Sequence, residues 1–161
     1  MSRRIDSPLS LVSDMDSGRR RLLAILALFV VPWSFVDAGG RVTIVFPFGF
    51  VNFAPLSLED IVSFVTVDTI GLPQFLLAWP VGVGIYLLAV ASAVSGVVLG
   101  REDRRVTALL LVLVGLTQLR MAIGFSGRIG TYAVPVVTVC ALALVWWFDW
   151  PVLRRSLPAQ D

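Results

Sequence analysis

Long apolar runs joined by short arginine-bearing connectors most constrain what this sequence can fold into. The runs cover residues 22–38, 75–99, 106–124 and 131–150. About 20 apolar residues in a helix span a bilayer, so each run is of spanning length or close to it. Of the 161 residues only 15% are charged, against about 25% in ordinary soluble domains. The sequence therefore predicts an all-α membrane protein, a bundle of four transmembrane helices.

The arginines orient these four predicted spans. All thirteen basic residues are arginine. Ten fall on one side of a four-span layout: Arg3, Arg4, Arg19, Arg20, Arg21, Arg101, Arg104, Arg105, Arg154 and Arg155. Because positive charge is retained on the cytoplasmic side, we expect a multi-pass protein of the plasma membrane with both termini in the cytoplasm. Residues 1–18 and 156–161 form its tails, and 19–155 its membrane domain.

The first run also permits a second interpretation, as a secretory signal peptide. Basic residues precede it, and Val36-Asp37-Ala38 resembles a small-residue cleavage site before Gly39. The long polar segment before the run and the further spans after it favour a retained helix.

The small set of titratable side chains excludes most familiar catalytic and metal-binding sites. The chain has no histidine and a single cysteine, Cys140, which lies inside an apolar run. The usual imidazole base and metal ligand are therefore missing, and a thiol in apolar surroundings is usually inert. We expect no catalytic residue, no metal and no cofactor. The arginine clusters form no broad basic face, so nucleic acid is not an expected partner.

The outer loop, residues 39–72, is the longest segment between spans. β-Branched and aromatic residues flank Pro47-Phe48-Gly49, which predicts a short hairpin. Ser57 precedes an acidic first turn and predicts the N-cap of an amphipathic helix over residues 58–67. Four phenylalanines, Phe46, Phe48, Phe50 and Phe53, form either a lid over the bundle or a docking surface for a membrane protein or lipid-linked ligand.

One charge lies within a predicted span. Arg120 sits near the outer end of the third span, and Asp37 sits at the matching depth of the first. A charge in a span is costly unless it snorkels to the interface, is paired or lines a wet cavity, and at this depth snorkelling alone could rescue Arg120. We therefore expect an intramembrane polar cluster of Asp37, Thr117, Gln118 and Arg120. It serves either as a clasp between spans or as a substrate or proton site.

Two further features concern packing. Ser92, Gly96 and Gly100 recur every fourth residue in the second span and predict a helix-packing face, since small residues let helices approach closely. Asp149 lies beside Trp150 at the inner interface, where Arg154 or Arg155 can reach back to it. We expect that carboxylate to form a surface ion pair.

Three stretches carry a family resemblance: Arg-Arg-Arg-Leu-Leu at 19–23, Val-Val-Pro-Trp-Ser-Phe-Val-Asp at 30–37 and Trp-Pro-Val-Gly-Val-Gly at 79–84. They are similar to a family of small haloarchaeal membrane proteins that are typically encoded near archaeosortase. That family brings no established activity. The resemblance implies an archaeal origin and an accessory role at the cell surface.

These observations favour a non-enzymatic accessory or scaffold protein of a membrane or cell-surface complex. Its expected partners are membrane lipids and either another membrane protein or further copies of itself. The alternative is a small transporter or channel subunit that uses the cluster around Arg120 and Asp37.

Overall fold

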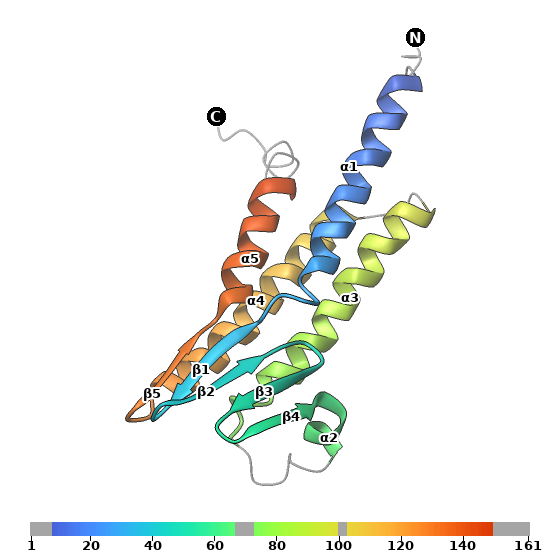
Figure 1. Ribbon diagram of the computed structural model, residues 1–161. Helices are drawn as coiled ribbons and strands as arrows, with labels where there is room; N and C mark the ends of the chain where they lie inside the picture. Colours follow the sequence, from blue (N-terminus) through green and yellow to red (C-terminus); the bar gives the residue numbers. More distant parts are fainter. Residues whose placement is uncertain (1–7, 67–72, 100–102, 150–161) are drawn as a thin grey trace, which may run out of the picture.

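The computed structural model describes residues 8–66, 73–99 and 103–149. Four helical segments lie side by side, and a β-sheet lies at one end of them (Figure 1). The helices are α1 (Pro8–Ala27), α3 (Ala78–Leu99), α4 (Arg104–Ser126) and α5 (Val136–Leu144), which continues into a π-helical turn, η1 (Val145–Asp149). Helix α1 extends past the end of its neighbours on the side away from the sheet (Figure 1). The sequence assigned its first half to a tail.

The sheet has five antiparallel strands in the order β4-β3-β2-β1-β5. The strands are β1 (Ser34–Ala38), β2 (Arg41–Val45), β3 (Gly49–Phe53), β4 (Leu56–Asp60) and β5 (Thr131–Val134). Four of them follow α1 as consecutive hairpins. The fifth comes from the connection between α4 and α5 and pairs with β1, joining Phe35 to Val134 and Asp37 to Tyr132.

The sheet corrects the prediction of an all-α four-helix bundle with spans over 22–38 and 131–150. The last residues of the first apolar run and the first residues of the fourth form strands β1 and β5, and α5 begins only after Pro135. Among the described residues, α3 and α4 are the two helices long and apolar enough to cross a membrane. Hydropathy measures apolar content, which a buried strand and a helix share.

The change from helix to strand after α1 is fixed by buried aromatic contacts. Pro32 blocks helix continuation, and Trp33 follows it, fully buried. The Trp33 indole N–H donates to the Leu28 carbonyl at 2.9 Å, and its ring meets Tyr86 edge-on, with centroids 5.6 Å apart. The Tyr86 hydroxyl donates to the Ile25 carbonyl at 3.0 Å. Trp33 is therefore a core residue.

Helices α3 and α4 pack through small residues. Gly82, Ala89 and Ala93 of α3 are buried, and the hydroxyls of Ser92 and Thr107 lie 2.7 Å apart across the pair. Ser92 of the predicted packing face thus contacts α4. Gly96 is half-buried, and Gly100 lies outside the described residues.

The helix of the outer loop is shorter than predicted. Helix α2 covers Ile61–Thr66, because residues 56–60 form β4 instead. Its cap is Asp60 rather than Ser57: one Asp60 carboxylate oxygen accepts from the Val62 and Ser63 amides at 2.9 and 3.0 Å. The other oxygen accepts from the Ser63 hydroxyl at 2.7 Å. Asp60 therefore ends β4 and starts α2.

The Asp60 cap predicts an acid-sensitive α2. Hydrogen bonds from the Ser63 amide and hydroxyl, which outweigh the opposing effect of burial, and then from the Val62 amide, hold the pKa of Asp60 below its usual 3.8. A lowered folded-state pKa means that the stabilisation is complete above pH 3.8 and is lost as the pH falls through that lower pKa. The protection factors of the α2 amides, which correct for the intrinsic pH dependence of exchange, should fall over that range. In Asp60→Asn, protection factors that still fall over the same range would contradict this assignment.

Candidate functional site

The face of the sheet turned toward the helices carries alternate residues of each strand. Pairing aligns Val36 with Thr43 and Thr43 with Asn52 in one cross-strand row. A second row aligns Val45 with Phe50 and Phe50 with Glu59. Because successive side chains of a strand point to opposite faces, both rows face the helices together.

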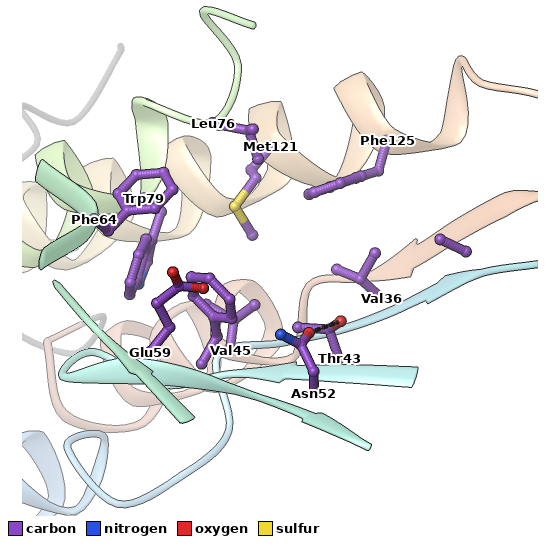
Figure 2. A pocket seen from close by; sticks show the side chains of 12 residues that line it. Val36, Thr43, Val45, Asn52, Glu59, Phe64, Leu76, Trp79, Met121 and Phe125 are labelled. Atoms are coloured by element: carbon purple, nitrogen blue, oxygen red, sulfur yellow. Dashed lines mark hydrogen bonds between the residues drawn. The ribbon is translucent and has the colours of Figure 1, made fainter. Parts of the chain in front are cut away.

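Between this face and the helices lies an open cavity of about 450 Å³ (Figure 2). That volume falls within the usual range for small-molecule sites, roughly 300–1,000 Å³. The lining from the sheet is Val36, Ala38, Thr43, Val45, Phe50, Asn52 and Glu59, and the lining from the helical side is Phe64, Leu76, Trp79, Met121 and Phe125. The lining is thus mainly apolar and aromatic, with three polar side chains on the strands.

Three aromatic rings meet at one end of the cavity. Phe50 and Phe64 have centroids 6.1 Å apart, Phe50 and Trp79 5.7 Å, and Phe64 and Trp79 5.0 Å. Their interplanar angles are 86°, 67° and 66°, so each ring turns an edge to another's face. The Trp79 indole N–H donates to the Phe46 carbonyl at 2.9 Å, which ties this α3 ring to the β2–β3 turn.

The polar residues of the lining differ in whether their side chains have hydrogen-bond partners. The Thr43 hydroxyl donates to the Asn52 side-chain oxygen at 2.6 Å, and the Asn52 amide donates to the Ser57 hydroxyl at 3.1 Å. Glu59 is half-buried, and no cation or hydrogen-bond donor of the described residues contacts its carboxylate. Figure 2 shows that carboxylate directed from β4 toward the helices, beside Phe64 and Trp79. It is the charged group of the cavity lining.

The predicted polar cluster is not assembled. The Asp37 carboxylate accepts from the Gly40 amide at 2.8 Å and closes the β1–β2 turn. Arg120 is exposed and lines a separate depression of about 320 Å³ with Gln74 and Thr117. Among the described side chains, Asp37 and Arg120 form no ion pair with each other.

Gln118, the third member, is buried elsewhere. It is fully enclosed, and its side-chain oxygen accepts from the Ser34 hydroxyl at 3.3 Å, tying α4 to β1. The Thr117 hydroxyl donates to the Val114 carbonyl at 2.8 Å, within its own helix. The four predicted residues therefore serve a turn, a helix–strand contact, an internal helix bond and a surface depression.

The four predicted phenylalanines do not form one surface, because the β2–β3 hairpin directs them to different places. Phe46 and Phe48 stack with centroids 5.1 Å apart, and Phe48 contacts Phe29 at 5.6 Å. Phe50 lines the cavity, whereas Phe53 is on the opposite face of the sheet and 54% exposed. The predicted turn at residues 47–49 is confirmed, since β2 ends at Val45 and β3 begins at Gly49.

A buried ion pair joins the interior of α1 to the last residue of η1. Arg21 and Asp149 are 3% and 1% exposed, and their charged atoms lie 2.9 Å apart between α1 and η1. Asp149 is thus buried rather than at the surface as expected. Arg154 and Arg155, its expected partners, lie outside the described residues. The π-helical turn places Asp149 inward while Trp146 and Trp147 remain exposed. The sequence contained both charges but gave no indication that they meet.

The comparison with protein families found a match, and the comparison with curated proteins found none. The matching family is described as a domain of unknown function, DUF8050, and the match covers residues 3–158. This leaves the resemblance to haloarchaeal, archaeosortase-associated proteins a prediction. Because the match covers nearly all of the sequence, the chain belongs to the DUF8050 family.

Proposed function

We propose that this chain is an integral membrane protein that acts by binding, as a non-enzymatic accessory subunit, with its sheet on the outer side. Support for the membrane location comes from the exposed surfaces of α3 and α4. In the most apolar stretches of α3 and α4, 22% and 44% of the residues, respectively, are buried. A core helix of a soluble protein is mostly buried instead. Exposed apolar side chains such as Leu87, Leu88 and Leu116 would contact the lipid acyl chains.

The placed arginines support the orientation. Arg104 and Arg105 begin α4 at the end of the bundle away from the sheet (Figure 1). Arg21 lies toward that same end, where it meets Asp149 at the end of α5 and η1. Since positive charge is retained in the cytoplasm, we infer that the sheet lies outside and that the start of α1 and the end of η1 lie inside.

The observation that carries the accessory role is an apolar row on the outward face of the sheet. Strand pairing aligns Val134, Phe35, Ile44, Val51 and Leu58 across all five strands. Val134 and Leu58 are 59% and 72% exposed. Exposed apolar patches of this kind mark interaction sites on folded proteins. We propose that an apolar surface of another membrane protein covers this row.

The interior of the bundle favours binding over transport. Ala89, Leu111, Val114, Val137 and Ala141 are buried and fill the space between the helices. The depression beside Arg120 is lined by α3, α4 and the segment just before α3, and by none of these five core residues. A transport path needs polar groups through the bundle. A transporter subunit is accordingly the weaker proposal.

The topology is tested by cysteine labelling in intact cells. Because Cys140 is the one cysteine of the chain, Cys140→Ala gives a background free of thiols. In that background Arg41→Cys, on exposed β2, should react with a membrane-impermeant maleimide. Arg105→Cys, at the end of α4 away from the sheet, should react only after the membrane is permeabilised. The reverse pattern, or labelling of both, would refute the outward placement of the sheet.

The accessory role is tested separately by photo-crosslinking. A photoreactive amino acid at Leu58, in the outward row, should form an adduct with a second, different protein. The matched control is Leu88, which is 60% exposed on the apolar helix α3 and should crosslink to lipid. If Leu58 gave only lipid adducts, the accessory role would be wrong even with the topology intact.

A further inference from the structure

We propose that the cavity between the sheet and the helices binds an apolar molecule bearing one positively charged nitrogen, an alkylammonium amphiphile. The cation sits between the Glu59 carboxylate and the rings of Phe50, Phe64 and Trp79. The inference deepens the proposed function and rests on it, because it supplies the ligand class for a protein that acts by binding.

The first step is the charge of the cavity. Glu59 is half-buried and is aligned with Phe50 across the β3–β4 pair. Its carboxylate has no cation or donor partner among the described residues. Removing a carboxylate from water is costly unless an opposite charge or a donor compensates it. A ligand cation provides that compensation.

The second step is the aromatic surroundings of that charge. The Phe50, Phe64 and Trp79 rings lie at steep angles to one another, with centroids 5.0–6.1 Å apart. Ring faces attract cations, most strongly the face of tryptophan, and such surfaces recognise alkylated ammonium groups. A metal ion is a poor alternative, because Ca²⁺ and Mg²⁺ require about six oxygen ligands. Among the described residues no group of acidic, cysteine or histidine side chains is arranged to hold a metal.

The third step is the apolar remainder of the lining. Beyond the rings the cavity continues along Val36, Val45 and Met121, which carry no charge. Such a surface gains free energy by covering an alkyl chain, at about 25 cal/mol per Å² of apolar area removed from water. A cation without a chain would leave this part empty, and a chain without a cation would leave Glu59 uncompensated. The cavity therefore fits both parts of one molecule.

The test is calorimetric titration of the full chain in maltoside micelles with hexyltrimethylammonium, a short probe. We expect saturable binding to one site. Hexanoate, with a similar chain and the opposite charge, should not bind, and tetramethylammonium should bind at least about tenfold more weakly. Dihexanoylphosphatidylcholine carries the same cation on a phospholipid. Tighter binding of this lipid than of hexyltrimethylammonium would identify the natural ligand as a lipid with this headgroup. Weaker binding would identify it as a free alkylammonium compound, and either result supports the site.

Two variants assign the binding to Glu59. Glu59→Gln keeps the shape and removes the charge, and it should weaken hexyltrimethylammonium binding about tenfold or more. The control is Arg41→Gln, which removes an exposed charge outside the cavity and should leave the affinity within about twofold. An unchanged thermal midpoint verifies that each variant is folded. Equal binding of hexanoate, no saturable binding, or an unaffected Glu59→Gln would overturn the proposal, while the labelling test of topology stands independently.

Discussion

Replacing Arg21 by leucine should destabilise the folded chain by about 3–5 kcal/mol, the usual cost of removing one partner of a buried ion pair. Arg21 and Asp149 are 3% and 1% exposed, with charged atoms 2.9 Å apart. Without the guanidinium, the Asp149 carboxylate stays in an interior that solvates it poorly. The free energy of unfolding, measured by denaturant titration of the purified protein in maltoside, gives the loss directly.

The control for this prediction lies two residues earlier on the same helix. Arg19 is exposed, so Arg19→Leu should change the free energy of unfolding by at most about 0.5 kcal/mol. The double variant Arg21→Leu/Asp149→Leu should recover most of the loss, because replacing both charges with apolar groups is often neutral or stabilising. A double variant as unstable as the two single losses combined would show that the pair itself does not account for the effect.

The helices of the centre of the chain were the part most open to prediction. The expected spans 75–99 and 106–124 correspond to α3 and α4, at Ala78–Leu99 and Arg104–Ser126. Each is long, apolar and bounded by a charged connector, so local composition decides its structure. The hairpin at residues 47–49 was equally local, because Pro47 and Gly49 are turn residues between β-forming runs.

Strands β1 and β5 could not be predicted in the same way. Each lies in an apolar run that continues into a helix, and each is a strand because of a partner distant in sequence: Phe35 pairs with Val134, and Val36 with Ala133. The hydropathy of neighbouring residues cannot reveal a pairing between strands so far apart in the sequence. Recognising β1 as a strand rather than a helix end would have required the strand order in advance.

The candidate site was predicted only in part, for a related reason. Phe50 was among the phenylalanines expected to form either a lid or a docking surface, but Glu59 was assigned to the first turn of a helix. Leu56 and Leu58 alternate with Ser57 and Glu59, a period-two pattern that is typical of a strand. That pattern predicts Glu59 on the face opposite the leucines, and there the structure places it. The meeting of Arg21 with Asp149 depends on helix packing and on the π-helical turn, neither of which the sequence specifies.

Replacing Gly49 by alanine should open the β3–β4 pair and disable the cavity. A Cβ at Gly49 would lie 2.5 Å from the backbone oxygen of Glu59, and a backbone atom cannot move aside as a side chain can. Overpacking of this kind costs about 1–3 kcal/mol. Because the strain falls on the strand that carries Glu59, hydrogen exchange should accelerate in β4 while the amides of α3 and α4 keep their protection.

The same change at Gly84 separates this contact from a general effect of alanine. A Cβ there meets no atom within 4 Å, and alanine is the better helix former, so Gly84→Ala should be neutral or stabilising by up to about 1 kcal/mol. Hexyltrimethylammonium affinity should fall in Gly49→Ala and persist in Gly84→Ala, since only the former displaces Glu59 from the aromatic rings. If Gly49→Ala kept both β4 protection and affinity, the close approach of β3 to β4 would not be what positions the Glu59 carboxylate.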